Sequence, residues 1–324
     1  MEEIKEFCEY GYHISTGCNV INLDGLWDRC FSKAPPVIDS REGYIKLFMN
    51  KHILVTNDDG VLAPGLMALA QEMRKLGKVS ILAPDRNWSA GGHVKTLDRA
   101  LRVREFILAD GSKAFASDGA PSDCVALATL GYFKEPIDLV VSGINMGANL
   151  GHDVTYSGTV TAAMEAVIAN VPGIAVSLET IEGHLGDVDF GPAARAVSKV
   201  IQHVIENGLP SEILLNVNVP FLKDEEIRGF RLTRQGLRVY HSRLDEGVDP
   251  RGRPYYWIAG DAPTGVPERG TDIGALAEGC VSVTPLHLDL TAYRAVTDLS
   301  TWSWDEENQL PFFELHVQER QEKV

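Results

Sequence analysis

Apolar runs alternate with helical patterns along the middle of the chain. Short runs rich in β-branched residues predict strands that are buried on both faces, at residues 53–56, 79–83, 137–142, 174–177 and 213–218. Between them, apolar residues with helical spacing predict helices at residues 63–76, 121–130, 160–170 and 192–207. A weaker pair of strands, at 101–108 and 113–116, is joined by a turn at Asp110 and Gly111. This order predicts an α/β fold, with a mostly parallel sheet and helices on both faces.

Polar loops follow three of these predicted strands, at residues 57–59, 85–93 and 145–153. Sheets of this kind bind ligands outside the carboxyl ends of their strands. We therefore expect the three loops to lie together and to form a site.

The first loop places Asp58 and Asp59 directly after a buried strand, with Gly60 free to turn. One interpretation is that the two carboxylates hold a divalent cation, because buried carboxylates are unfavourable without a cationic partner. The other is an ordinary turn whose acidic residues are solvated or cap a helix. The segment alone favours the turn, whereas the other loops favour the cation.

Four side chains in the three loops supply oxygen donors: Asp58, Asp59, Ser89 and Asn145. A donor set without cysteine or obligatory histidine favours one hard cation, Mg²⁺ or Mn²⁺. Such an ion can lower the pKa of bound water and stabilise charge on a phosphoryl group. The two aspartates are therefore also the candidate catalytic residues, in proton transfer or as nucleophile.

Candidate substrate contacts lie near these donors. Ser157, Gly158 and Thr159 open a predicted helix, where backbone N–H groups suit a phosphate, although an ordinary serine cap is the alternative. Asn57 and Asn149 are candidates for orienting water or phosphate, or for holding their own loops.

His93 and His152 are weaker candidates for acid–base or phosphate contacts, since a lone histidine is usually structural.

The two ends of the chain differ from its middle. Residues 1–48 lack clean periodicity, and we interpret them as an N-terminal extension that is disordered, loosely attached or not native. Residues 49–227 form the predicted core. In residues 228–324, three short predicted strands, at 230–233, 255–259 and 281–284, are separated by long loops, which suggest projecting arms or subunit contacts. We expect this region to complete the fold and to carry a projecting hairpin and an oligomerisation arm. An aromatic block, Tyr255, Tyr256 and Trp257, fits either an interface or the core of an ordinary hairpin.

Composition excludes several classes of protein. The formal charge of -15 and the pI near 5.0 disfavour a nucleic-acid polymer or an anionic membrane as partner. Five cysteines without metal-ligand spacing argue against structural zinc and a disulfide framework, and Cys124 falls in an apolar helix pattern as inert core. We expect a cytoplasmic protein, because no membrane span or signal peptide is recognisable.

Several long motifs resemble the SurE family, the survival-protein 5'/3'-nucleotidases. The motifs are ILVTNDDGVLAPG, APDRNWSAGGH, DLVVSGINMGANLGHDVTYSGTVTAAMEA, DPRGRPYYWIAGD, TDIGALAEG and CVSVTPLHLDLT. They occur in the family's order from Met49 to Tyr293. The resemblance implies a Rossmann-like core, a homodimer or homotetramer with exchanged C-terminal arms, and hydrolysis of nucleoside monophosphates or short polyphosphate.

The resemblance also places the family's metal ligands on Asp58, Asp59, Ser89 and Asn145, and its phosphate-proximal loop on residues 156–159. Two positions depart from the family pattern. Ala120 stands where threonine is common, and Cys280 replaces a usual aromatic residue. Neither departure touches the metal motif.

The leading hypothesis is a divalent-metal-dependent phosphatase that hydrolyses nucleoside 5'- or 3'-monophosphates. A nucleotide-binding regulator without turnover is the alternative. A dinucleotide-dependent oxidoreductase is disfavoured, because the acidic turn stands where a glycine-rich GxGxxG loop would follow the first strand.

Overall fold

The computed structural model describes residues 38–39, 44–45, 51–180, 187–299 and 301–302. The chain divides into two compact units, Met1–Val37 and Ile38–Val324. The first unit lies outside the described residues, so the architecture below is that of the second. None of the helices in the described part of the chain has the length and hydropathy needed to cross a bilayer.

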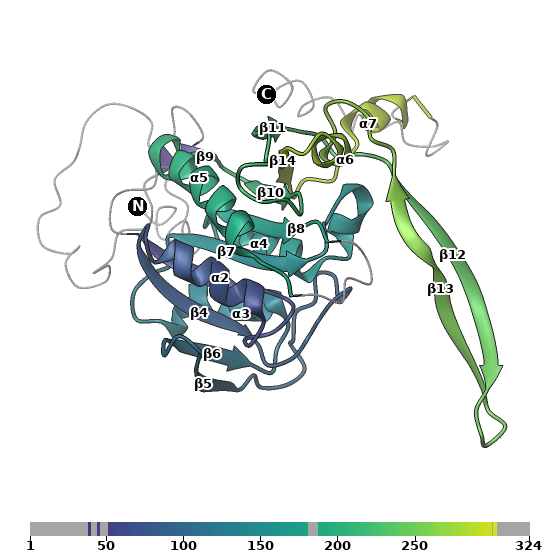
Figure 1. Cartoon of the computed structure of the whole chain (residues 1–324), viewed down its shortest axis with the longest axis horizontal. Coiled ribbons are helices and arrows are strands. Elements are labelled where there is room, and N and C mark those ends of the chain that lie inside the picture. Colours follow the sequence, from purple (N-terminus) through teal and green to yellow (C-terminus); the bar gives the residue numbers. More distant parts are fainter. Residues whose placement is uncertain (1–37, 40–43, 46–50, 181–186, 300, 303–324) are drawn as a thin grey trace, which may run out of the picture. The chain divides into compact units, whose positions relative to one another are not determined.

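A nine-stranded sheet forms the centre of the second unit, in the order β11-β14-β10-β8-β7-β3-β4-β6-β5 (Figure 1). The bounds are β3 (His52–Thr56), β4 (Lys78–Pro84), β5 (Val103–Ile107), β6 (Lys113–Ser117), β7 (Leu139–Met146), β8 (Gly173–Leu178), β10 (Ile213–Val219), β11 (Phe230–Leu232) and β14 (Val281–His287). Pairing is parallel from β10 through β6, whereas β5 and β14 run antiparallel to their inner neighbours β6 and β10. The predicted mostly parallel sheet is confirmed.

Helices cover both faces of this sheet. The bounds are α2 (Pro64–Met73), α3 (Pro121–Leu127), α4 (Gly158–Ile168), α5 (Gly191–Asn207), α6 (Asp272–Ala277) and α7 (Tyr293–Leu299), with short helical turns at η2 (Ala128–Tyr132) and η3 (Gly151–Thr155). In β3, Ile53 and Val55 pack with the core residues of α2 and α5, while Leu54 packs with those of α3 and α4. Successive strand residues point to opposite faces, so a continuous apolar run requires cover on both sides.

Strand β3 lies at the point where the winding of the chain reverses. The chain passes from β3 to β4 on one side and returns to β7 on the other side. Loops after neighbouring strands leave in opposite directions at such a point and open a crevice at the carboxyl edge. The acidic turn after β3 therefore lies where a ligand site is expected.

The C-terminal region contains a hairpin, as predicted, but its strands are longer than expected. Strands β12 (Arg238–Val248) and β13 (Pro254–Gly265) pair antiparallel, so the predicted strand at residues 255–259 is only part of β13, and β12 was not predicted as a strand (Figure 1). The mixture of charged and apolar residues in β12 hid its period-two pattern. Tyr255, Tyr256 and Trp257 are 47%, 60% and 67% exposed, so they are not the core of an ordinary hairpin.

Three short strands form a second, small sheet. Strand β2 (Tyr44–Ile45) pairs with β1 (Ile38–Asp39) on one side and with β9 (Leu209–Pro210) on the other. The rest of the predicted extension, residues 1–48, lies outside the described residues. The predicted boundaries at residues 48 and 227 stay predictions.

Candidate active site

The turn after β3 is built by its own asparagine. The Asn57 side chain donates to the Gly60 carbonyl (3.0 Å) and accepts from the Gly60 N–H (3.2 Å). Gly60 has a φ of 102°, in the left-handed region that favours glycine. Both polar groups of Asn57 thus hold the turn, which is the second of the two roles predicted for this residue.

Asp58 is enclosed by the start of helix α4. It is 3% exposed, and the Thr159 hydroxyl donates to its Oδ1. Burial raises the pKa of Asp58, while the Thr159 hydroxyl and the backbone N–H groups of Thr159 and Gly158 act in the opposite direction. A Cβ atom on Gly158 would lie 2.7 Å from the Asp58 Cβ, so only glycine permits this approach. The first turn of α4 therefore determines the position and the hydrogen bonding of the Asp58 carboxylate.

Asp59 is partly buried beside Asp58. Burial, and next the charge of Asp58, raise its pKa to about 6, while the backbone N–H of Met146 lowers it. The Asn87 side chain donates to Asp59 Oδ1 at 3.3 Å. Asp59 is thereby in contact with the loop that follows β4 and with the last residue of β7.

The loop after β4 is attached to the acidic turn at the residue before Ser89. The neighbouring Trp88 N–H donates to the Asp58 carbonyl (2.7 Å), and the Ser89 N–H donates to Asn87 Oδ1 (2.7 Å). Ser89 itself is exposed, and its hydroxyl bonds to no described residue. The loop thus places Ser89 next in sequence to a residue that touches Asp58.

Asn145 lies within β7, although residues 145–153 were predicted to follow a strand that ends at residue 142. The β7–β8 register shifts between Ser142 and Asn145, and such an irregularity re-aims side chains beside active sites. Asn145 Nδ2 donates to the Gly147 carbonyl at 2.7 Å, and no described residue donates to Oδ1. The amide oxygen is therefore free to coordinate a cation.

The chemistry of these residues fits a divalent metal ion. In the part of the chain that the structure describes, no lysine, arginine or histidine pairs with Asp58 or Asp59. Two adjacent, desolvated carboxylates without a cation are unfavourable, and a divalent ion removes that penalty. The described residues include no cluster of three or more histidine, cysteine, aspartate or glutamate side chains with metal-site geometry. The two carboxylates, an amide oxygen and a hydroxyl suit a hard cation that retains water.

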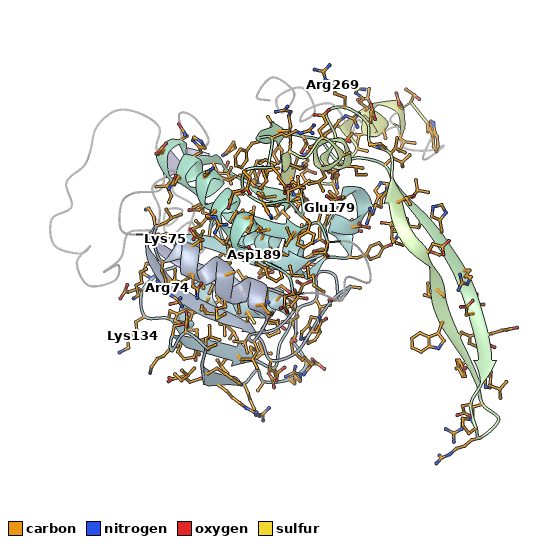
Figure 2. All side chains as sticks on the ribbon, in the orientation of Figure 1. Arg74, Lys75, Lys134, Glu179, Asp189 and Arg269 are labelled. Atoms are coloured by element: carbon orange, nitrogen blue, oxygen red, sulfur yellow. The ribbon has the colours of Figure 1, made fainter. Side chains whose placement is uncertain are left out.

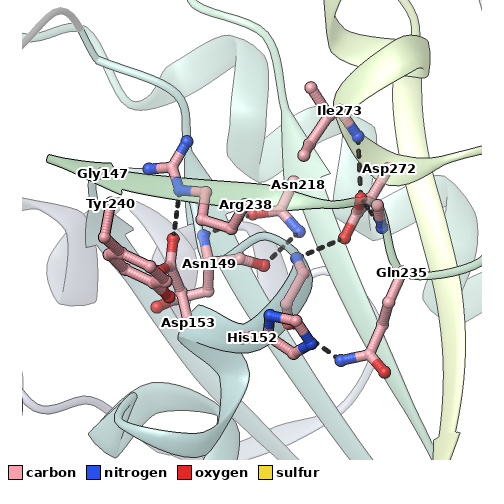
Figure 3. Close-up of polar contacts among 12 residues, drawn as sticks. Gly147, Asn149, His152, Asp153, Asn218, Gln235, Arg238, Tyr240, Asp272 and Ile273 are labelled. Atoms are coloured by element: carbon pink, nitrogen blue, oxygen red, sulfur yellow. Dashed lines mark hydrogen bonds and ion pairs between the residues drawn. The ribbon is translucent and has the colours of Figure 1, made fainter. Parts of the chain in front are cut away.

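A buried network fixes the loop after β7 (Figure 3). The Asn149 N–H donates to Asn218 Oδ1 (2.8 Å), and Asn149 Nδ2 donates to Ser177 Oγ (2.7 Å). Further along, the Gly151 N–H donates to the buried carboxylate of Asp272 (2.8 Å). Asn149 thus holds its own loop, one of the two roles predicted for it.

The base of the hairpin is tied to the same loop. Arg238 Nε lies 2.8 Å from Asp153 Oδ2, and the Tyr240 hydroxyl donates to Asp153 Oδ1 at 2.7 Å (Figure 3). Burial and the Asp153 carboxylate raise the pKa of Tyr240 to about 12, which keeps its hydroxyl a donor. Strand β12 is therefore connected to the segment that leads into α4.

The remaining candidates have structural partners. Ser157 caps α4, its hydroxyl accepting from the Val160 N–H at 3.1 Å. His93 pairs with Glu165 at 3.0 Å, while the His152 side chain bonds to no described residue. Cys124 is fully buried, and burial raises the pKa of its thiol, so the prediction of an inert core residue is confirmed.

Four contributors were missed from the sequence: Asn87, Met146, Glu165 and the Thr159 hydroxyl acting on Asp58. For Glu165 a signal existed, because it is the single charged residue in an otherwise mostly apolar helix. The others touch the acidic turn only through the tertiary fold.

Comparisons with known proteins match most of the chain. The sequence model of the family described as survival protein SurE matches residues 53–242. The chain is 53% identical over 254 residues to a 5'-nucleotidase SurE of Herpetosiphon aurantiacus, covering 78% of this chain and 99% of that protein. It is 51% identical to the 5'-nucleotidase SurE of Chloroflexus aggregans, covering 78% and 100%. The crystal structure of a SurE protein from Aquifex aeolicus matches with a TM-score of 0.65 and 42% identity, covering 77% of this chain and 98% of that one.

Proposed function

The chain belongs to the survival protein SurE family, and from that premise we propose that it is a 5'-nucleotidase. The reaction is the hydrolysis of a nucleoside monophosphate to nucleoside and phosphate. One observation carries the proposal: two adjacent desolvated carboxylates, with no cationic partner among the described residues, lie where the winding of the sheet reverses. The names of the relatives, 5'-nucleotidase SurE, support it.

We propose that one divalent ion, Mg²⁺ or Mn²⁺, is held by Asp58, Asp59, Ser89 and Asn145. When bound, such an ion lowers the pKa of a water molecule and neutralises charge on the phosphoryl group. The chain determines the geometry: the Thr159 hydroxyl fixes one Asp58 oxygen, and Asn87 orients Asp59. Asp59 is more accessible than Asp58, so it is the carboxylate that can exchange a proton with the substrate or with water.

Contact of the phosphate with Ser157, Gly158 and Thr159 stays a prediction. The Ser157 hydroxyl caps α4, and the N–H groups of Gly158 and Thr159 face Asp58, so these groups act first on the scaffold. If Ser157 also touches the phosphate, Ser157→Ala raises the KM for AMP. If Ser157 serves only as a cap, thermal stability falls while KM is unchanged.

Phosphate release from AMP tests the main proposal. We expect turnover with Mn²⁺ or Mg²⁺, no turnover in excess EDTA, and recovery on adding back the metal. Full activity in EDTA contradicts the proposal. Binding of AMP without release of phosphate would indicate the alternative, a nucleotide-binding regulator.

Finer properties also stay predictions. Panels of 5'- and 3'-monophosphates and of short polyphosphates, each assayed with Mg²⁺, Mn²⁺, Co²⁺ and Zn²⁺, will define substrate and metal preference. Homo-oligomerisation through the C-terminal arms and a cytoplasmic location are tested by the mass in solution and by cell fractionation.

A further inference from the structure

One face of helix α4 reaches successive parts of the candidate active site. Gly158, Thr161 and Glu165 are spaced by three and four positions, so they lie along one side of the helix. Gly158 adjoins Asp58, and the Thr161 hydroxyl donates to the Gly92 carbonyl at 3.1 Å. Glu165 reaches the residues that follow Gly92. The helix thus contacts both the acidic turn and the loop after β4.

Glu165 is a buried carboxylate with two cationic partners on that loop. It is 4% exposed, and it accepts from Lys95 Nζ at 2.6 Å and pairs with His93 Nε2 at 3.0 Å. Burial alone would raise the pKa of Glu165, but the His93 and Lys95 contacts outweigh it and lower the pKa. Removing this carboxylate leaves His93 and Lys95 without an acceptor, so the loop after β4 loses its attachment to α4 at these two residues.

The loop after β4 needs external contacts to keep one conformation, because residues 85–102 contain no helix or strand. On one side of Ser89, the Trp88 N–H donates to the Asp58 carbonyl. On the other side, the Gly92 N–H donates to the Tyr156 carbonyl (2.9 Å), and His93 and Lys95 meet Glu165. Ser89 lies between these two anchors, so its position depends on both.

We propose that Glu165 is a positioning residue for the metal site: by holding His93 and Lys95 it fixes the loop after β4 so that the Ser89 hydroxyl faces the acidic turn. The proposal rests on the proposed function, because it assumes that Ser89 is a ligand of the divalent ion. Glu165 touches neither the ion nor the substrate. Its effect is on the affinity for the ion, not on the chemical step.

Glu165→Gln tests this role in the full-length chain. Glutamine keeps the length of the side chain but presents an amide N–H₂ group where a carboxylate accepted, so one of the two loop contacts is lost. We expect calorimetric titration with Mn²⁺ to give a Kd about tenfold weaker than wild type, as for changes in groups that orient metal ligands. At saturating Mn²⁺, kcat and the KM for AMP should return close to wild type.

A matched control separates this effect from general destabilisation. Asp138 is a carboxylate at the opposite edge of the sheet, where it accepts from the His52 N–H at 2.8 Å. Asp138→Asn makes the same chemical change, and we expect it to leave the Mn²⁺ affinity unchanged. If Asp138→Asn weakens Mn²⁺ binding as much as Glu165→Gln, the effect is general and the proposal is wrong.

A second variant keeps the proposal testable if Glu165→Gln does not fold. The double change His93→Gln and Lys95→Gln alters the loop side of the contact, where both side chains are partly exposed. It should weaken Mn²⁺ binding similarly. Wild-type Mn²⁺ affinity in whichever of these variants folds would overturn the role of Glu165. If the wild-type chain binds Mn²⁺ but releases no phosphate, the proposed function fails, whereas the Kd comparison still decides the role of Glu165.

Discussion

The acidic turn after β3 and the hairpin β12–β13 each place side chains in an environment that does not suit them, in opposite ways. At the turn, charged groups are desolvated without a described cation against them. On the hairpin, apolar groups are exposed: Trp257 is 67% and Ile258 90% exposed, and among the described strands β12 and β13 pair with no others. Buried charge and exposed apolar surface are the two unusual placements in a folded protein. We therefore expect the turn to bind an ionic ligand and the hairpin to contact another protein surface.

The two regions also differ in how they are held. The acidic turn is contacted by the loop after β4, by the end of β7 and by α4, so its geometry is fixed from several sides. The hairpin is tied at its base through Arg238, Tyr240 and Asp153, and beyond that its side chains stand out from the ribbon (Figure 2). Changes at the turn should therefore affect catalysis, whereas changes along the hairpin should affect assembly.

The largest effect is expected from Asp58→Asn. Loss of one metal carboxylate should reduce phosphate release from AMP by at least about a thousandfold. The metal-free variant should also melt at a higher temperature than metal-free wild type, because burial raises the pKa of Asp58 and disfavours its charge. Asp224→Asn, in an exposed ion pair with Arg195, is the control and should keep its activity. Substantial activity in Asp58→Asn would contradict the assignment.

Gly158→Ala should come next. The added Cβ would lie 2.7 Å from the Asp58 Cβ and 3.0 Å from its Oδ2, so the carboxylate must move. A displacement of this size should reduce kcat/KM about a hundredfold. Gly111→Ala strains a turn whose φ is 79°, which costs stability, but the added atom meets open space and should leave kcat/KM unchanged. Wild-type kcat/KM in Gly158→Ala would show that the position of Asp58 tolerates this shift.

The pH dependence of stability should distinguish the metal-free from the metal-bound chain. The pKa of Asp59 is about 6 in the folded chain against 3.8 for the free side chain. Between about pH 4 and 6 the unfolded chain loses this proton first, so the free energy of unfolding of the metal-free chain should fall as pH rises. Mn²⁺ should reverse this fall at neutral pH. Melting curves in EDTA and in Mn²⁺, with Asp59→Asn as control, measure both effects.

The smallest effect on the folded chain is expected on the hairpin. Trp257→Ser should change the free energy of unfolding of an isolated subunit by less than about 0.5 kcal/mol, because the side chain is exposed. If the hairpin meets a second copy, the same change should lower the mass measured by light scattering. Leu130→Ser, 85% exposed in η2 and outside the hairpin, should leave that mass unchanged. Equal masses for wild type and both variants would argue against an arm-mediated oligomer.

The sequence by itself determined the order of the strands and helices of the core and the motifs of the site. Both are local patterns: an apolar run such as residues 53–56 requires cover on both faces, and polar loops follow such strands. The ends of the strands were predicted less accurately. Strand β7, for example, continues to Met146 through an irregularity that no run of apolar residues marks.

Only the tertiary structure decided which side chains contact and position the residues of those motifs. The Thr159 hydroxyl reaches Asp58 across 101 positions of sequence, and Glu165 reaches Lys95 across 70. Neither contact leaves a periodic signal, since each depends on how a helix packs against a loop. The exposure of the hairpin aromatics was likewise decided by the fold, because one sequence pattern serves a buried hairpin and a projecting one equally well.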